Sequence, residues 1–102
     1  VVHCAARVHV LRESASEAER AHRAMNADLP VRLAEAARTA GVRRFIQISS
    51  VAAVASSSAP REVINDATTP RPTSPYGQSK LAADRMLASF NDNAFSVVSL
   101  RP

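Results

Sequence analysis

Three short apolar runs alternate with longer helix-forming stretches, and this alternation constrains the fold more than any other feature of the chain. The runs are residues 1–6, 45–49 and 95–100. Short runs of this kind are typical of strands that are covered on both faces of a parallel sheet. The order strand, helix, strand, helix, strand therefore predicts an α/β fold with a parallel sheet and right-handed crossovers.

Both ends of the 102-residue chain fall inside or just beyond such a run. The length is that of one small domain, and the 46% hydrophobic and 22% charged residues are ordinary for a globular protein. A sheet that starts and stops so abruptly leaves pairing groups and apolar surface uncovered. We therefore expect the chain to be a piece of a larger domain.

The first helical stretch is expected to begin at Ser16, whose spacing to Glu19 fits a capping box, and to run to Ala40. Gly41 follows at the position of a left-handed C-cap. Pro30 predicts a kink or a break near residues 28–30, because proline lacks the amide that the helix needs. Alternatively, Pro30 is the first residue of a new helix. The inward face would then carry Leu29, Leu33, Ala36, Ala37 and Ala40.

The second half begins with a long irregular connection over residues 51–75, which contains a serine run and four prolines. A loop of this length is usually a lid, a binding loop or a disordered segment. Ser74 then fits an N-cap and Pro75 a first helical turn, so we expect a helix from about Tyr76 to Phe90.

Scarce glycine and cysteine exclude several kinds of site. The two glycines, Gly41 and Gly77, lie far apart, so a Gly-rich phosphate loop cannot form within these residues. Cys4 is the single cysteine and has no disulfide partner. With only His3, His9 and His22 as companions, it does not predict a zinc site, and we expect no metal.

Charge and hydropathy argue against two classes of partner. The net charge is +4, but the basic residues are scattered and only one tyrosine is present, so we expect no nucleic acid partner. No apolar run approaches the ~20 residues that cross a bilayer, and no basic-then-apolar leader opens the chain. We expect no membrane contact and a cytoplasmic location.

Tyr76 and Lys80 are the single tyrosine and the single lysine, and they lie four residues apart on the expected helix. This spacing places both on one face. A phenol is a weak base at neutral pH, but an adjacent ammonium favours the phenolate. Tyr76 is therefore a candidate proton acceptor. Ser50 ends the second strand, where parallel sheets place their ligands, and its hydroxyl could bind the same substrate oxygen.

Five segments, in order, resemble the extended short-chain dehydrogenase/reductases, in the NAD-dependent epimerase/dehydratase group that contains UDP-glucose 4-epimerases. They are His-Cys-Ala-Ala at residues 3–6, Asn26 with Ala-Gly-Val at residues 40–42, the strand ending in Ser49 and Ser50, Pro-Tyr-Gly-Gln-Ser-Lys at residues 75–80, and Leu-Arg-Pro at residues 100–102. The resemblance covers nearly the whole chain.

This resemblance implies the central portion of a three-layer Rossmann-like sheet, the fourth to sixth strands, with about three strands and two to three helices. It implies NAD or NADP as cofactor and a nucleotide-sugar substrate. Tyr76 would be the base, Lys80 its electrostatic partner and a ribose ligand, and Ser50 the substrate-oxygen donor. Cys4, Ala5, Ala6 and Ser49 would lie along the cofactor. The helices before Gly41 and after Pro75 would form homodimer contacts.

The chain also departs from the family pattern. The Gly-rich loop and the substrate domain are absent, so we expect these 102 residues alone to be inactive and to bind NAD weakly or not at all. Leu29 and Pro30 stand where Gly-Thr is frequent, and residues 51–54 lack the frequent Tyr-Gly. A non-catalytic nucleotide-binding or dimerising protein on the same fold is the alternative function.

Structural roles compete with these functional ones. Tyr76 and Lys80 could be a plain helix pair with a snorkelling lysine. We interpret His3 as a core histidine and Cys4 as a small buried hydrophobic residue. Asn26 could be a capping or helix-breaking residue.

Overall fold

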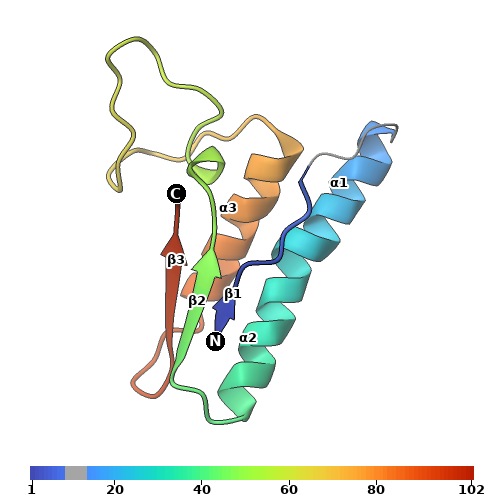
Figure 1. The fold of residues 1–102 in the computed structure, drawn as a ribbon, viewed down its shortest axis with the longest axis vertical. Coiled ribbons are helices and arrows are strands. Elements are labelled where there is room, and N and C mark those ends of the chain that lie inside the picture. Colours follow the sequence, from blue (N-terminus) through green and yellow to red (C-terminus); the bar gives the residue numbers. More distant parts are fainter. Residues whose placement is uncertain (9–13) are drawn as a thin grey trace.

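The structure is a computed structural model in which residues 1–8 and 14–102 are described. Its sheet has three parallel strands in the order β1 (Val2–His3), β2 (Arg44–Ile48) and β3 (Ser96–Leu100). Val2 pairs with Ile46, and Arg44 pairs with Ser96. The chain between β1 and β2 forms one long helical rod, and the chain between β2 and β3 forms a loop followed by a helix (Figure 1). The predicted α/β parallel architecture is confirmed.

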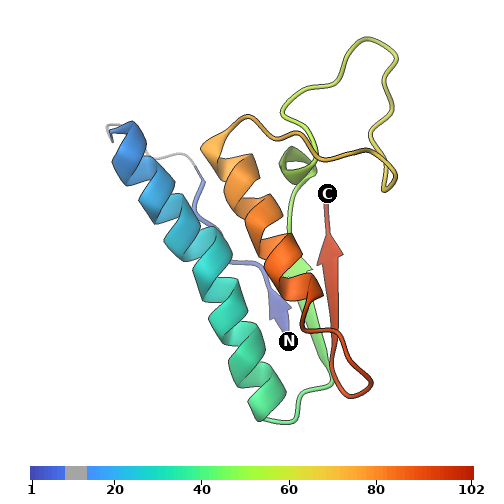
Figure 2. The same ribbon diagram turned by 180° about the vertical axis from the view of Figure 1, so that it is seen from behind.

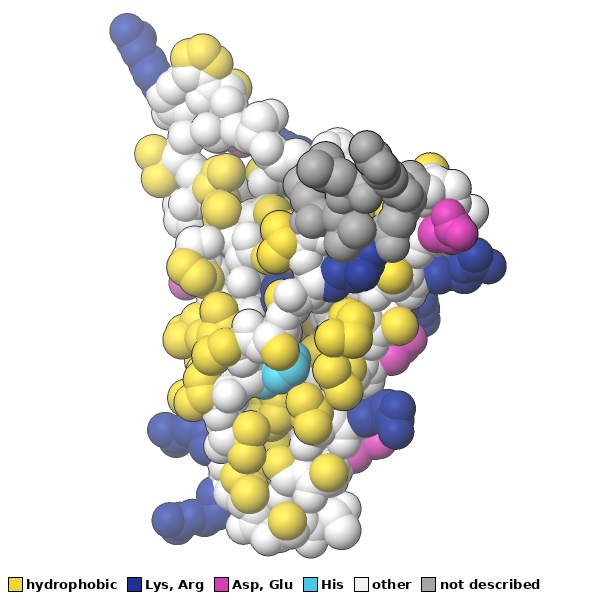
Figure 3. Space-filling view, turned by 45° about the vertical axis from the view of Figure 1, so that its right-hand side comes forward, with side chains coloured by type: hydrophobic (Ala, Val, Ile, Leu, Met, Phe, Trp, Pro, Cys, Tyr) yellow, Lys and Arg dark blue, Asp and Glu magenta, His cyan; other side chains and the backbone are white. Residues whose placement is uncertain are grey.

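Helices cover one face of this sheet. The long rod and α3 (Pro75–Ala88) lie side by side, behind the strands in Figure 1 and in front of them in Figure 2, which is seen from the opposite side. Within the described residues nothing covers the opposite face, so these residues supply two of the three expected layers. The first strand was expected to be covered on both faces, and this is wrong: Val1 and Val2 are 55% and 59% exposed. Figure 3 shows hydrophobic side chains gathered in the middle of the side seen there, with charges toward its margins.

The long rod consists of α1 (Ala15–Arg23), a π-helical turn η1 (Ala24–Asp28) and α2 (Leu29–Thr39). The capping box was expected at Ser16 and Glu19, but Ser14 and Glu17 form it. The Glu17 amide donates to Ser14 Oγ, and the Ser14 amide donates to Glu17 Oε2. The same Ser-x-x-Glu spacing occurs two residues earlier, and the helix begins there.

Pro30 neither kinks the rod sharply nor breaks it. It stands in the first turn of α2, as the alternative prediction had it. The π-helical turn directly precedes it, and such a turn inserts an extra residue into the helical ladder. The irregularity that proline requires is therefore absorbed by Ala24–Asp28 without loss of direction (Figure 2).

The inward face of the rod differs from the predicted one. Ala27, Pro30, Ala34 and Ala37 are buried, whereas Leu33 is 38% exposed and Ala36 and Ala40 are exposed. Among the five residues expected on the inward face, only Ala37 is buried. The buried face starts one residue later than a face that begins at Leu29, because Pro30 itself packs inward. The small side chains of Ala34 and Ala37 on this buried face let α2 lie close to the sheet.

The apolar core lies at the amino ends of β2 and β3. Phe45, Leu87 and Phe95 pack there against Ala34 and Ala37. Phe45, Gln47 and Ser49 alternate with less buried residues along the second strand and face the helices. Gly41 has a φ of +77°, which confirms the left-handed C-cap.

Candidate functional site

The candidate site lies at the carboxyl ends of the parallel strands, where α/β sheets bind ligands. Ser49 and Ser50 follow β2, and Arg101 follows β3. α3 begins at Ser74, whose hydroxyl accepts from the Gly77 amide, so the predicted Ser-Pro helix start is confirmed. The first turns of α3 pack against η2 (Val51–Ala53), a short 3₁₀ turn that follows Ser50.

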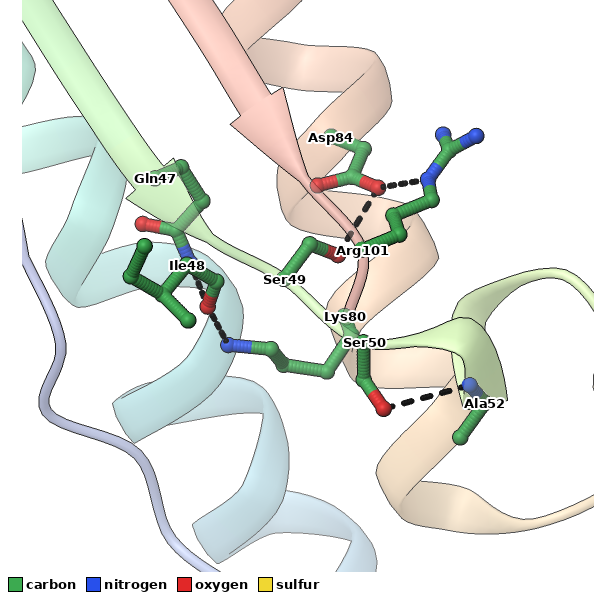
Figure 4. A network of polar contacts seen from close by, with 8 residues as sticks. All are labelled: Gln47, Ile48, Ser49, Ser50, Ala52, Lys80, Asp84 and Arg101. Atoms are coloured by element: carbon green, nitrogen blue, oxygen red, sulfur yellow. Dashed lines mark hydrogen bonds and ion pairs between the residues drawn. The ribbon is translucent and has the colours of Figure 1, made fainter. Parts of the chain in front are cut away.

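Lys80 is buried at the centre of this site. Its side chain crosses toward the end of β2, and Nζ donates to the Ile48 carbonyl at 2.6 Å (Figure 4). The residue is only 1% exposed. Burial lowers the pKa of the Lys80 ammonium, and the carboxylate of Asp84 opposes this shift. A plain snorkelling lysine would hold its ammonium in water, so that alternative does not describe Lys80.

Ser50 turns its side chain toward η2. Its Oγ accepts from the Ala52 amide at 3.1 Å and thereby caps the 3₁₀ turn. Ser49 and Ser50 point to different sides of the chain, as successive residues of an extended segment do (Figure 4). The hydroxyl hydrogen of Ser50 remains available for an oxygen acceptor, because the capping bond uses only a lone pair.

Tyr76 lies in the first turn of α3 and is partly exposed. Its ring meets that of His22 on α1 edge-on, with 6.2 Å between the centroids. No described residue hydrogen-bonds to its hydroxyl, which is therefore free to meet a substrate.

Gly77 lets α3 approach the turn that follows Ser50. A Cβ built on Gly77 would lie 2.2 Å from the Ala52 carbonyl oxygen and 3.1 Å from Pro72 Cβ. No larger residue fits without movement of the backbone. The close approach brings the turn that carries Tyr76 next to the segment that carries Ser50.

Asn26 joins three segments. Its Oδ1 accepts from the Arg7 amide at 2.7 Å, and its Nδ2 donates to the Arg7 carbonyl at 2.9 Å and to Ser79 Oγ at 3.1 Å. The side chain is fully buried within the π-helical turn. Asn26 thus neither caps nor breaks the helix; it fixes the chain beyond β1 against α3.

The segment after β1 is open. Cys4, Ala5 and Ala6 are exposed, so the interpretation of Cys4 as a buried hydrophobic residue is wrong. His3 is buried as predicted, with its ring 6.3 Å from that of Phe45. Burial and the charge of Lys80 lower the pKa of His3.

Neither a metal-binding group nor a membrane-spanning helix occurs among residues 1–8 and 14–102. Among them, no three histidine, cysteine or acidic side chains gather as a metal-binding group would require. His9, which the sequence offered as a companion of Cys4, lies outside the described residues. No helix in the described part of the chain has the length and apolar character needed to cross a bilayer.

The sequence prediction missed Asp84, which is 6% exposed and lies one turn beyond Lys80 on α3. Its Oδ2 accepts from Ser49 Oγ and from Arg101 Nε, each at 2.9 Å (Figure 4). A signal was present, because Tyr76, Lys80 and Asp84 recur every four residues and so share one helix face.

Space for a ligand lies beside this network. A small depression of about 120 Å³ is lined by Val51, Val54, Ile64, Asn65, Asp66 and Arg101. It adjoins the segment that carries Ser50, on the side of the long loop.

Known proteins resemble most or all of this chain. A UDP-glucose 4-epimerase from Vibrio cholerae is 35% identical over an alignment of 103 positions, which covers all of this chain and 31% of the relative. A UDP-Glc/GlcNAc 4-epimerase from Campylobacter jejuni is 28% identical with a TM-score of 0.79, over 98% of this chain and 30% of that one. MoeE5, solved with UDP-glucuronic acid and NAD, is 37% identical with a TM-score of 0.66, over 78% and 27%.

The chain thus spans less than a third of these proteins. The model of the NAD dependent epimerase/dehydratase family matches residues 1–102, which confirms the resemblance drawn from the five sequence segments. This chain belongs to the NAD-dependent epimerase/dehydratase family.

Proposed function

We propose that this chain carries the proton-transfer groups of an NAD(P)-dependent epimerase, dehydratase or related oxidoreductase that acts on a nucleotide sugar. One observation carries the proposal. The ammonium of Lys80 is buried at the end of β2, where it bonds Ile48, two residues before Ser50, and Lys80 lies one helical turn from Tyr76. Burial of a lone lysine at the ligand-binding edge of a parallel sheet is hard to explain as a contribution to stability.

Each of the three side chains has a role in this proposal. Tyr76, as its phenolate, takes the proton of a substrate hydroxyl, and the Lys80 cation stabilises that phenolate before the transfer. The Ser50 hydroxyl donates to the same substrate oxygen and holds it in place. A bound nicotinamide would supply the hydride acceptor for the carbon that bears this hydroxyl. In this proposal the sugar approaches from the side of the depression that Val51 and Arg101 line.

The residues present fit such a cofactor. Within the described residues the Lys80 ammonium makes one hydrogen bond, to Ile48, which leaves two N–H groups for ribose hydroxyls. Cys4, Ala5 and Ala6 offer small, exposed side chains along which a flat group can lie. The Ser49 hydroxyl donates to Asp84, so in this proposal Ser49 contacts the cofactor through its backbone.

The proposed epimerase, dehydratase or oxidoreductase activity belongs to a longer protein of which these 102 residues are a part. Neither the Gly-rich loop nor a substrate domain occurs in these 102 residues. We propose that they form the fourth to sixth strands of a larger Rossmann domain in a cytoplasmic enzyme. Calorimetry on the isolated 102 residues should find NAD binding weak or absent, and micromolar affinity would contradict this.

The helices supply a candidate homodimer surface. The rod and α3 lie side by side on one face of the sheet (Figure 2), and Met25 and Leu33 expose apolar surface on the rod. We propose that these helices pair with those of a second copy. Light scattering on the full-length protein should report a dimer, and Leu33→Glu should shift it toward monomer.

Tyr76→Phe in the full-length protein is the decisive test. We expect kcat to fall by about 10²- to 10⁴-fold, because the proton acceptor is lost while the ring remains against His22. NAD affinity, measured by calorimetry, should stay unchanged. Near-normal turnover would remove Tyr76 as the base and favour the non-catalytic alternative.

A further inference from the structure

Asp84 is a buried carboxylate to which the proposed reaction gives no role. It accepts from Ser49 and Arg101 through Oδ2, whereas its buried Oδ1 has no hydrogen-bond partner among the described residues. A buried charge is unfavourable unless it is paired and hydrogen-bonded. Its place in the site therefore calls for a function.

The contacts of Asp84 join three elements. Ser49 follows β2, Arg101 follows β3, and Asp84 itself belongs to α3. Figure 4 shows the carboxylate between the two partners, on the side of the chain away from Ser50. Ile48, whose carbonyl receives the Lys80 ammonium, directly precedes Ser49. The network therefore fixes the Ile48 carbonyl at the position where it accepts the hydrogen bond of Lys80.

Asp84 also supplies charge. Within the described residues the Lys80 ammonium bonds only a neutral carbonyl, so its charge needs a nearby anion. Of the other titratable or charged groups, His3 on β1 interacts with the Lys80 charge, Tyr76 precedes Lys80 by one turn of α3, and Arg101 is paired with Asp84; none of the three is a carboxylate. Asp84, one turn away, raises the pKa of Lys80 against the effect of burial.

We propose that Asp84 is a positioning residue: it ties the ends of β2 and β3 to α3 through Ser49 and Arg101, and its negative charge keeps Lys80 protonated. The inference rests on the proposed function, in which Lys80 acts as a cation. Arg101 tempers this effect, because its guanidinium neutralises part of the carboxylate charge.

Two substitutions should therefore act on Lys80 in opposite directions. Asp84→Asn keeps the shape and one acceptor oxygen but removes the anion, so the pKa of Lys80 should fall. Arg101→Met frees the carboxylate to act on the lysine alone, so the pKa of Lys80 should rise. A network that only held the fold together would produce no such pair of opposite shifts.

NMR of the full-length protein without cofactor measures these shifts directly. Lysine labelled with ¹³C at Cε reports its own titration, and the signal that disappears in Lys80→Met identifies Lys80. A lower titration point in Asp84→Asn and a higher one in Arg101→Met support the proposal. No shift, or shifts in one direction, overturn it. If Asp84→Asn does not fold, Arg101→Met decides alone, and an unshifted titration there is contrary to the proposal.

Activity then shows whether the charge matters for the reaction. For Asp84→Asn we expect kcat/KM to fall by about 10- to 100-fold at neutral pH. The decline of activity at high pH should also begin at a lower pH. Asp84→Glu should recover part of both, whereas unaltered activity and an unaltered profile would overturn the proposal.

A matched control is Asp92→Asn. Asp92 also pairs with an arginine, Arg38, but on the surface and far along the chain from Lys80. Its substitution should leave the Lys80 titration and kcat/KM unchanged, and an equal effect there would count against a special role for Asp84. Failure of the proposed function appears separately, as an active Tyr76→Phe variant.

Discussion

The two halves of α3 bury different kinds of side chain. Its carboxyl-terminal half places Leu87 in an apolar core with Phe45 and Phe95. Its amino-terminal part, up to Asp84, buries the polar side chains of Ser79, Lys80 and Asp84 together with the small or apolar residues Gly77, Leu81 and Ala83. One helix therefore serves as a packing element at one end and as a support for polar groups at the other.

The difference shows where stability and chemistry are concentrated. Apolar contacts are non-directional, so several side chains of similar volume can fill the space around Phe45. The polar half depends on single partners at defined distances, such as Ile48 for Lys80 and Ser49 for Asp84. Substitutions in the two halves should therefore separate loss of stability from loss of activity.

The largest effect on stability is expected in the apolar core against which the carboxyl-terminal end of α3 packs. Phe45 is fully buried, and Phe45→Ala should lower the free energy of unfolding by about 3 to 5 kcal/mol. Chemical denaturation of the full-length protein measures this. Val63→Ala, at a side chain that is 76% exposed, is the control and should change little. A loss below about 1 kcal/mol at Phe45 would disagree with a tightly packed core.

Gly77→Ala should disturb the polar half. The added methyl meets the Ala52 carbonyl oxygen, so the backbone must move and unfolding becomes easier by about 1 to 3 kcal/mol. The same movement separates Tyr76 from Ser50, and kcat/KM should fall by about 10-fold or more.

Gly41→Ala is the matched control for this substitution. Gly41 has space around it but a left-handed φ, so alanine there should weaken the fold by about 1 kcal/mol and leave kcat/KM unchanged. If Gly77→Ala behaved in the same way, the close approach would have no bearing on the site.

The smallest effect concerns pH and His3 on β1, which has its ring near Phe45 and interacts with the charge of Lys80. Because burial lowers the pKa of His3, the unfolded chain takes up its proton first as the pH falls below about 6.5. The stability that neutral His3 provides is complete above that pH and declines below it. The melting temperature should therefore drop more between pH 8 and pH 5 in the wild type than in His3→Gln. Equal drops would show that His3 does not contribute.

The same contrast explains how far prediction from sequence reached. Ser74 with Pro75, and Gly41 at a helix end, are local signals, and both were predicted correctly. The inward face of α2 was wrong apart from Ala37, because Pro30 packs inward after a π-helical turn that no local pattern announces. The first strand was predicted as covered, since its apolar residues do not reveal how many layers the chain itself supplies.

The candidate site was predicted in its parts and not in its connections. Ser50, Tyr76 and Lys80 follow from residue type and spacing, and the structure places them on facing elements; their catalytic roles remain predictions. Asp84 was missed because its partners, Ser49 and Arg101, are 35 and 17 residues away. Partners so distant in sequence can be recognised only when the fold brings them together.

The side chain of Asn26 links three segments of the chain by hydrogen bonds. One amide pairs with both backbone groups of Arg7, 19 residues before it, and with Ser79, 53 residues after it. The Asn26 side chain bonds both the amide and the carbonyl of Arg7, as the backbone of a neighbouring strand would. The segment after His3 is therefore held in place although it no longer pairs within the sheet. Loss of these hydrogen bonds would release three segments at once, so substitutions within η1 should change the positions of Tyr76 and Lys80.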